Sequence, residues 1–218
     1  MKIKLHVLLC LILLLTLLTG CGSADEKNIR TCYAKYLVAF DNDDGKTAAS
    51  LVSKDTIDYY GQILDCALNS SESQTHALSY WRKILVLQAR ARFPADELQT
   101  LAPEDYFSYT VKHNSSDLGT EKQKKQQKIF KLGKITIQGE KASVQALVNG
   151  VEVPDAFFFV KEGNNWKMDL VPGMTRAEGI LAAQLQSQKI SEDEMLVIAL
   201  KRGGLDISPD IWKPLNKH

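Results

Sequence analysis

The chain has 218 residues, of which 24% are charged and 44% are hydrophobic, and its formal net charge is +1. This composition is ordinary for a globular protein, and the length suits one domain with or without an extension. The balanced charge excludes a general electrostatic attraction to nucleic acid.

The first twenty residues have the three parts of an export signal. Lys2 and Lys4 form a basic start, and an apolar run of about 14 residues follows from Leu5 to Leu18. This run is shorter than the roughly 20 residues that a membrane-spanning helix needs. It ends in Leu18-Thr19-Gly20-Cys21, a tetrad that resembles the lipobox of bacterial lipoproteins.

The resemblance implies that Cys21 is the lipidation site. Diacylglyceryl would be attached to its sulfur, residues 1–20 would be removed, and the freed amine would be acylated, so that several acyl chains hold the protein on a lipid bilayer. Gly22, rather than an aspartate, follows Cys21, which favours the outer membrane, facing the periplasm, if the source is Gram-negative. Residues 21–25 then form a tether of at most roughly 18 Å. The alternative is an ordinary cleaved signal with an incidental cysteine.

Two cysteines, Cys32 and Cys66, remain in the part of the chain that is expected to fold. The predicted compartment can oxidise them. If the first two helices form a hairpin, the two residues lie roughly 15 Å apart along the helices, whereas a disulfide requires Cα atoms within about 7 Å. Two buried thiols are therefore the favoured expectation, and a disulfide between strongly crossed helices is the alternative. Removal of residues 1–20 leaves 25 basic and 26 acidic side chains.

The N-terminal half has the apolar spacing of helices. In the third predicted helix the stripe consists of Leu78, Trp81, Ile84, Leu85 and Gln88. Turn residues and Pro94 separate the segments, and His113 falls in a polar stretch that is expected to be a loop. The predicted helices cover residues 26–41, 46–68, 72–92, 94–101 and 103–110.

Beyond about residue 112 the pattern changes to that of strands. Leu132 and Ile135 belong to two alternating sets of opposite phase, and Gly133 between them is where a bulge brings both sets onto one face. Further alternation and turn residues predict an antiparallel meander of about four strands, which ends in the segment 166–170. The final residues return to helix, over 174–187 and then from Ser191 to Gly203, followed by a short turn.

Helices followed by such a meander resemble the NTF2-like, or cystatin-like, superfamily of α+β folds. Gly139 to Val144 matches Gly-x-x-Ala-x-Val, and Trp166 to Leu170 contains Trp-Lys-hydrophobic-Asp, as in similar small secreted lipoproteins of unknown function. The resemblance covers residues 26–171 and leaves 172–218 as a C-terminal helical extension. It implies a curved sheet around a helix with a pocket between them, in a fold that hosts enzymes and non-enzymes alike.

No residue is assigned a catalytic role. On the helical wheel, the carboxylates of 46–68 point away from the centre of the apolar face, and Asp169 has the opposite parity to Met168 and Leu170, so it is expected to face away from them. The histidines are dispersed without metal-ligand spacing, so neither a metal nor another cofactor is expected.

The candidates for lining a ligand pocket are Tyr59, Tyr60, Asp155 and Trp166. Aromatic rings with polar tips suit a cavity that binds a partly apolar ligand, and Asp155 lies at a strand start where it can border a pocket mouth. For the three aromatic residues, ordinary core packing is the alternative.

The sequence thus favours a non-catalytic binding module of the cell envelope. Its expected partners are the bilayer through Cys21, a small apolar ligand, and an envelope protein that binds the C-terminal helices, as an immunity protein would. Nucleic acid is not among them. The lysine-rich segment 122–134 either contacts anionic head groups or is a solvated loop. A small hydrolase or dehydratase that uses the pocket is the alternative function.

Overall fold

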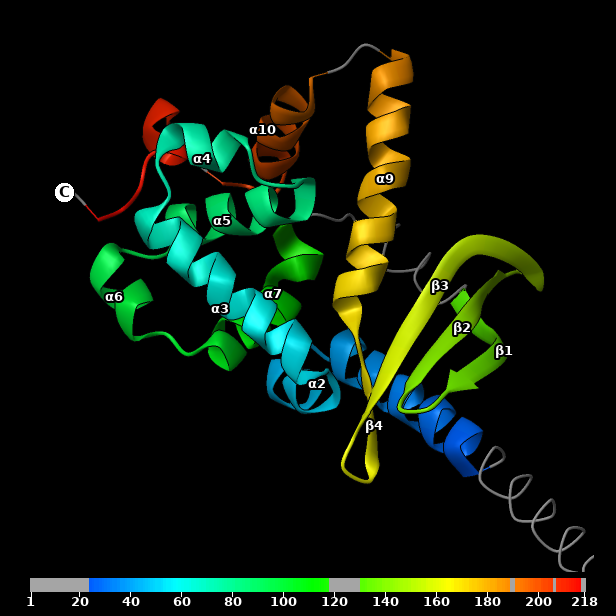
Figure 1. Cartoon of the computed structure of the whole chain (residues 1–218). Helices are drawn as coiled ribbons and strands as arrows, with labels where there is room; N and C mark the ends of the chain where they lie inside the picture. Colours follow the sequence, from blue (N-terminus) through cyan, green and yellow to red (C-terminus); the bar gives the residue numbers. More distant parts are fainter. Residues whose placement is uncertain (1–23, 118–129, 189–190, 206, 217–218) are drawn as a thin grey trace, which may run out of the picture.

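The computed structural model describes residues 24–117, 130–188, 191–205 and 207–216 (Figure 1). The predicted α+β class is confirmed, because helices and a four-stranded antiparallel sheet make up this part of the chain. The signal segment, Cys21 and the lysines between 122 and 128 lie outside the described residues. Among those that are described, no helix has both the length and the apolar character needed to cross a bilayer.

The N-terminal half is helical, as the apolar spacing predicts. A first helix spans residues 24–41. It is followed by α2 (Gly45–Leu51), α3 (Lys54–Asn69), α4 (Glu72–His76), α5 (Tyr80–Arg92), α6 (Ala95–Thr100) and α7 (Pro103–Asp117).

The single helix predicted over 46–68 is wrong, because the chain leaves helical geometry at Val52 and Ser53. Val52 forms a parallel bridge with Met168, and the Ser53 N–H donates to the Met168 carbonyl at 2.8 Å. The Ser53 hydroxyl then accepts the Thr56 N–H and caps α3. A tertiary contact with the sheet therefore interrupts a continuous helical pattern.

Two other predicted helices have different bounds. The segment 72–92 is divided into α4 and α5, because Ser71 and Gln74 form a capping box around α4 and Ser79 is extended at the start of α5. Helix α7 continues to Asp117 rather than ending at 110, so His113 is helical and the loop predicted for it is wrong.

The predicted meander is confirmed. Strands β1 (Phe130–Gln138), β2 (Lys141–Val148), β3 (Val151–Glu162) and β4 (Asn165–Met168) lie in the order β1-β2-β3-β4 with antiparallel pairing. The register shifts between Leu132 and Ile135, where the sequence predicts the bulge. Arg30 of the first helix donates to the carbonyls of Leu132 and Gly133 at 3.2 and 3.1 Å, so the exposed carbonyls of the bulge are satisfied.

The C-terminal part contains α9 (Leu170–Gln188), α10 (Glu192–Arg202) and a short 3-10 helix, η1 (Pro209–Trp212). Helix α9 begins at Leu170 rather than at the predicted Met174. The Leu170 N–H donates to the Thr56 hydroxyl at 3.0 Å, and Asp169 accepts the Val171 N–H. Two otherwise unsatisfied N–H groups of the first turn are thereby paired, which allows the helix to start early.

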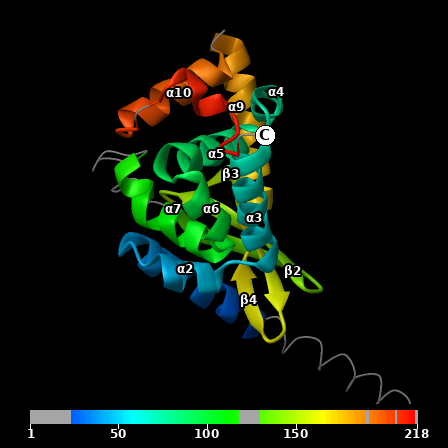
Figure 2. The same cartoon turned by 90° about the vertical axis from the view of Figure 1, so that its left-hand side faces the viewer.

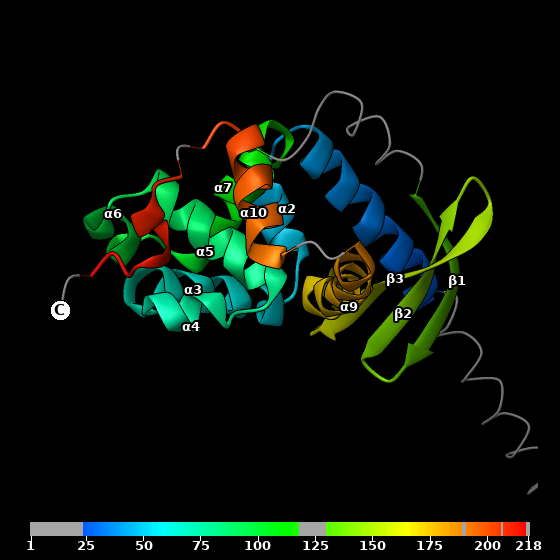
Figure 3. The ribbon, with the colours of Figure 1, turned by 90° about the horizontal axis from the view of Figure 1, so that it is seen from above.

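Helix α9 stands between the helical body and the sheet, and the first helix runs obliquely along the sheet (Figure 3). Turned by 90°, the helices form tiers, with α10 above α5 and α2 beneath α7 (Figure 2). The C-terminal residues belong to the same core cluster as the rest, since Leu196 and Leu200 of α10 are fully buried in it. The cavities described next lie where the helical body, α9 and the sheet meet.

Candidate ligand-binding site

Two adjoining cavities lie between the helices, α9 and β3. The helical cavity, enclosed mainly by the first helix, α3, α5 and α7, has a volume of about 180 Å³. The sheet-side cavity, between α5, α9 and β3, has a volume of about 370 Å³, within the range of roughly 300–1,000 Å³ typical of small-molecule sites. They share three wall residues, which are Trp81, Leu170 and Met174.

Aromatic rings dominate the wall of the helical cavity. Tyr60 meets Phe107 edge to face, with ring centroids 5.0 Å apart, and the Thr110 hydroxyl donates to the Phe107 carbonyl at 2.7 Å. Such packed pairs give rigid walls. The aromatic wall residues are Tyr36, Phe40, Tyr60, Trp81, Phe107 and Tyr109.

The polar residues of the helical cavity are all uncharged or weakly basic. They are Gln88, Thr110, His113 and the tyrosines, and no Asp, Glu, Lys or Arg is part of the described wall. The His113 ring lies tilted against that of Tyr109, with ring centroids 4.2 Å apart. Burial raises the pKa of Tyr36 and of Tyr60, so both phenols stay neutral at physiological pH.

Two polar groups of α5 lack partners among the residues that the structure describes. The indole Nε1–H of Trp81 is buried and has no acceptor, although the Trp81 backbone N–H donates to the Glu178 carboxylate at 2.9 Å. The Gln88 side chain is 8% exposed, lines the helical cavity, and makes no hydrogen bond within the described part of the chain. Among the described residues, Trp81 Nε1 is the fully buried side-chain group without a partner, whereas the Gln88 amide borders the helical cavity. Buried polar groups are nearly always paired in native proteins, so a ligand with polar groups suits this wall.

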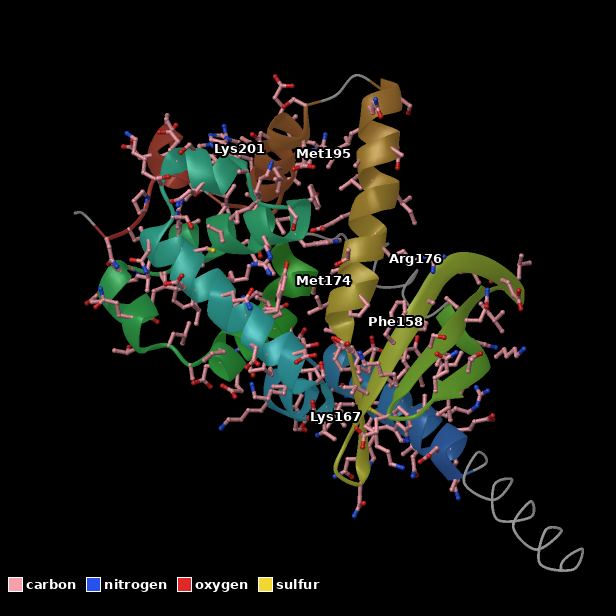
Figure 4. All side chains as sticks on the ribbon, viewed as in Figure 1. Phe158, Lys167, Met174, Arg176, Met195 and Lys201 are labelled. Carbon is pink, nitrogen blue, oxygen red and sulfur yellow. The ribbon has the colours of Figure 1, made fainter. Side chains whose placement is uncertain are left out.

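The sheet-side cavity is almost wholly apolar. Met174 and Arg176 lie on opposite sides of α9, Met174 toward α5 and Arg176 toward β3, where Phe158 lies (Figure 4). Arg176 and Asp169 are its charged wall residues, and the others are Trp81, Ala156, Phe157, Phe158, Met168, Leu170, Gly173, Met174 and Ala177.

Asp169 lines this cavity together with Met168 and Leu170, and the expectation that it faces away from them is wrong. The alternation of side-chain directions along a strand does not apply to Asp169, because β4 ends at Met168 and α9 begins at Leu170. Burial raises the pKa of Asp169, although its hydrogen bond from the Val171 N–H opposes this. The Ser53 hydroxyl also donates to it, at 3.4 Å. Its carboxylate therefore already serves as the cap of α9.

The structure places the four pocket candidates from the sequence differently. Tyr60 lines the helical cavity. Tyr59 is buried in the core outside both cavities, with the Arg82 guanidinium 4.7 Å from its ring centroid. Trp166 is 3% exposed, also outside both cavities, and donates from Nε1 to Asp25 at 2.9 Å. The backbone of Asp155 belongs to β3, and its side chain lies outside the described residues.

Sequence reasoning missed Trp81 and Gln88 as site residues. Both belong to the apolar stripe of the third predicted helix, and a glutamine within such a stripe was the available signal. The stripe itself does not distinguish a core-facing wall from a cavity wall, because the helical period is the same in both.

Cys32 and Cys66 are free thiols, and the alternative of a disulfide is not realised in the structure. The Cys32 Sγ lies 3.7 Å from the Leu51 carbonyl, just before α3 begins at Lys54. Cys66 is twelve residues beyond Lys54, about 18 Å further along the helix. Burial raises the pKa of the Cys32 thiol, which makes it a poor nucleophile.

No group of three or more His, Cys, Asp or Glu side chains is gathered in a metal-binding arrangement within the described ranges. Comparison of the chain with protein-family models, with characterised proteins and with solved structures finds no match. The chemistry of the cavities therefore has to be derived from their own residues. An aromatic and aliphatic wall with two unpartnered hydrogen-bonding groups can hold a small, largely apolar molecule that carries a polar group.

Proposed function

We propose that this protein is a lipid-anchored binding module of the cell envelope, which captures a small amphiphilic ligand in the two joined cavities. Acylated Cys21 would hold it on the bilayer, at the periplasmic face of the outer membrane in a Gram-negative source. The Leu-Thr-Gly-Cys ending of the apolar run supports the anchor. The NTF2-like fold is part of the proposal, and it is supported by helices that pack against an antiparallel meander and leave a pocket beside it.

The unsatisfied indole N–H of Trp81 at the junction of the two cavities carries this proposal. A buried donor without a partner costs roughly 1–3 kcal/mol, and Trp81 belongs to the wall of both cavities. A ligand that spans the junction and offers an acceptor recovers this cost. The surrounding apolar wall would add the hydrophobic contribution of the ligand's remaining surface.

A contact near the proposed anchor supports a short tether. Asp25 accepts hydrogen bonds from Trp166 Nε1 at 2.9 Å and from Lys161 Nζ at 3.0 Å. The chain is thus tied to β3 and β4 four positions after Cys21. The folded part would therefore remain close to the membrane surface rather than drift on a long linker.

A protein partner in the envelope remains part of the proposal. The C-terminal helices carry exposed apolar side chains that suit such a contact, namely Ile180 on α9, which is 48% exposed, and Ile198 on α10, which is 50% exposed. The enzyme alternative would rest on Asp169 as a base in the sheet-side cavity. Because that carboxylate already caps α9, a binding function is better supported.

Displacement of an apolar fluorescent probe tests the binding function. The protein is expressed without residues 1–20 and with Cys21→Ser, which keeps the fold because the core cluster and the residues packed on it run from Ile29 to Leu215. We expect saturable binding of 1-N-phenylnaphthylamine. Ala177→Phe fills the sheet-side cavity and should weaken binding by at least about tenfold.

Ala183→Phe is the matched control, because Ala183 is an exposed residue of the same helix and lines neither cavity. Binding by this variant should equal that of the wild type. Absence of saturable probe binding, or equal loss in both variants, would contradict the proposal.

A further inference from the structure

The helical cavity combines a buried amide with an absence of fixed charge. Gln88 offers both a carbonyl acceptor and two N–H donors, and it is 8% exposed. No Lys, Arg, Asp or Glu belongs to the described wall of this cavity. A charged group placed beside Gln88 would lose its hydration without gaining a counter-ion from the described wall, which is strongly unfavourable.

The position of Gln88 on α5 relates the two unpartnered groups to each other. Trp81 and Gln88 are seven residues apart, so they share one face of the helix and are separated by about 10 Å along its axis. Ile84 and Leu85 lie between them and line the same cavity. The wall thus has a polar group at each end of an apolar stretch.

We propose that the ligand is a neutral amphiphile with a carboxamide head, which enters the helical cavity and pairs with the Gln88 amide. This rests on the proposed function, because it names the ligand class of the same site. An amide head group can donate an N–H to the Gln88 carbonyl and accept a Gln88 N–H with its own carbonyl. The apolar chain of the ligand runs past Trp81 into the sheet-side cavity. Trp81 Nε1–H donates a hydrogen bond to an acceptor of the ligand near the junction of the two cavities.

The opposite orientation, with a charged head near Arg176 and the chain inside the helical cavity, is disfavoured by the same residues. Arg176 is exposed and can contact an anion at the rim. An aliphatic chain in the helical cavity, however, would cover the Gln88 amide without pairing it and would leave Trp81 Nε1 unsatisfied, and such groups strongly reduce affinity. The aromatic wall can attract a cation, so an ammonium head is a rival that the experiment has to include.

Three probes with the same chain and different heads decide the class. Dodecanamide, dodecanoate and dodecylammonium are titrated at pH 7 against the unlipidated protein that carries Cys21→Ser, with binding measured by calorimetry. We expect dodecanamide to bind at least about tenfold more tightly than either ion. Equal or tighter binding of dodecanoate or dodecylammonium overturns the proposal.

Gln88→Leu tests whether Gln88 recognises the head group of the ligand. It should weaken dodecanamide binding by roughly twofold to tenfold, the range of one net hydrogen bond. The same variant should also reduce the preference for dodecanamide over dodecanoate, which a purely structural glutamine would leave unchanged. Gln184→Leu, at an exposed position of α9, is the matched control.

The outcomes separate the two proposals. If phenylnaphthylamine does not bind the wild type, the binding function fails. If it binds but the amide is not preferred, or if Gln88→Leu keeps the full preference, only the ligand class fails. Should Gln88→Leu not fold, the three-probe comparison on the wild type still decides the class.

Discussion

Arg90 of α5 joins four parts of the helical body, and its removal should cost about 3–5 kcal/mol of unfolding free energy. The side chain is 6% exposed. Its guanidinium donates to six oxygens, those of Cys66, Ala67, Ser70, Thr75, Ile211 and Trp212, at 2.6–3.2 Å. None of the six belongs to a carboxylate, so Arg90 is a buried cation that is satisfied by carbonyls and one hydroxyl.

The magnitude follows from what Arg90→Met leaves behind. The carbonyls of Cys66 and Ala67, near the C-terminal end of α3, also accept the Ser70 and Leu215 N–H groups. Among the described residues, the carbonyls that would lose their donor are those of Ile211 and Trp212. Each carbonyl that stays buried without a donor costs roughly 1–3 kcal/mol, and partial access of water reduces the sum. The expected loss of about 3–5 kcal/mol is a large part of the 5–15 kcal/mol that typically stabilises a domain.

Urea denaturation followed by circular dichroism measures this loss. Arg90→Lys retains the charge but offers three donors, so its loss should be intermediate. Arg82→Met is the matched control, because Arg82 lies on the same helix, is half-buried, donates to Gln62 and lies over the Tyr59 ring. It should cost about 1–2 kcal/mol, clearly less than Arg90→Met. A loss below about 1 kcal/mol for Arg90→Met would refute the reasoning and mean that the six bonds contribute little in solution.

Three further expectations concern the anchor, the sheet and alkaline pH. Cys21→Ala should abolish labelling by radioactive palmitate and leave the protein outside the membrane fraction or uncleaved, and equal labelling of variant and wild type would contradict the anchor. Trp166→Ala should lower the unfolding free energy by about 3–5 kcal/mol, the range for a buried large aromatic, and an unchanged urea midpoint would mean that Trp166 is not packed in the core. Burial raises the pKa of Tyr33 to about 12 from its ordinary value of 10.0. Because the unfolded state releases this proton at lower pH, stability should be full below about pH 10 and be lost as the pH rises through 12. Tyr33→Phe should flatten this alkaline decline in thermal melts, and an unaltered decline would assign it to other groups.

Local patterns in the sequence were sufficient for the sheet and for several helix ends. The bulge lies between Leu132 and Ile135 because a change of alternation phase beside a glycine is a local signal. Ser191 caps α10 by accepting the Glu194 N–H, again within four residues. The lipobox resemblance at Cys21 is also a property of the sequence alone, and it stays a prediction because that segment lies outside the described residues.

Only the tertiary structure decided where regular patterns are interrupted and which walls enclose a cavity. Met168 pairs with Val52 and ends a helix that the apolar spacing alone would continue. Trp81 and Gln88 gain a site only because Leu170 and Met174, distant in the chain, lie opposite them. Periodicity records which face of a helix is buried, and it contains no information on whether the space beyond that face is filled. That depends on contacts between segments far apart in sequence.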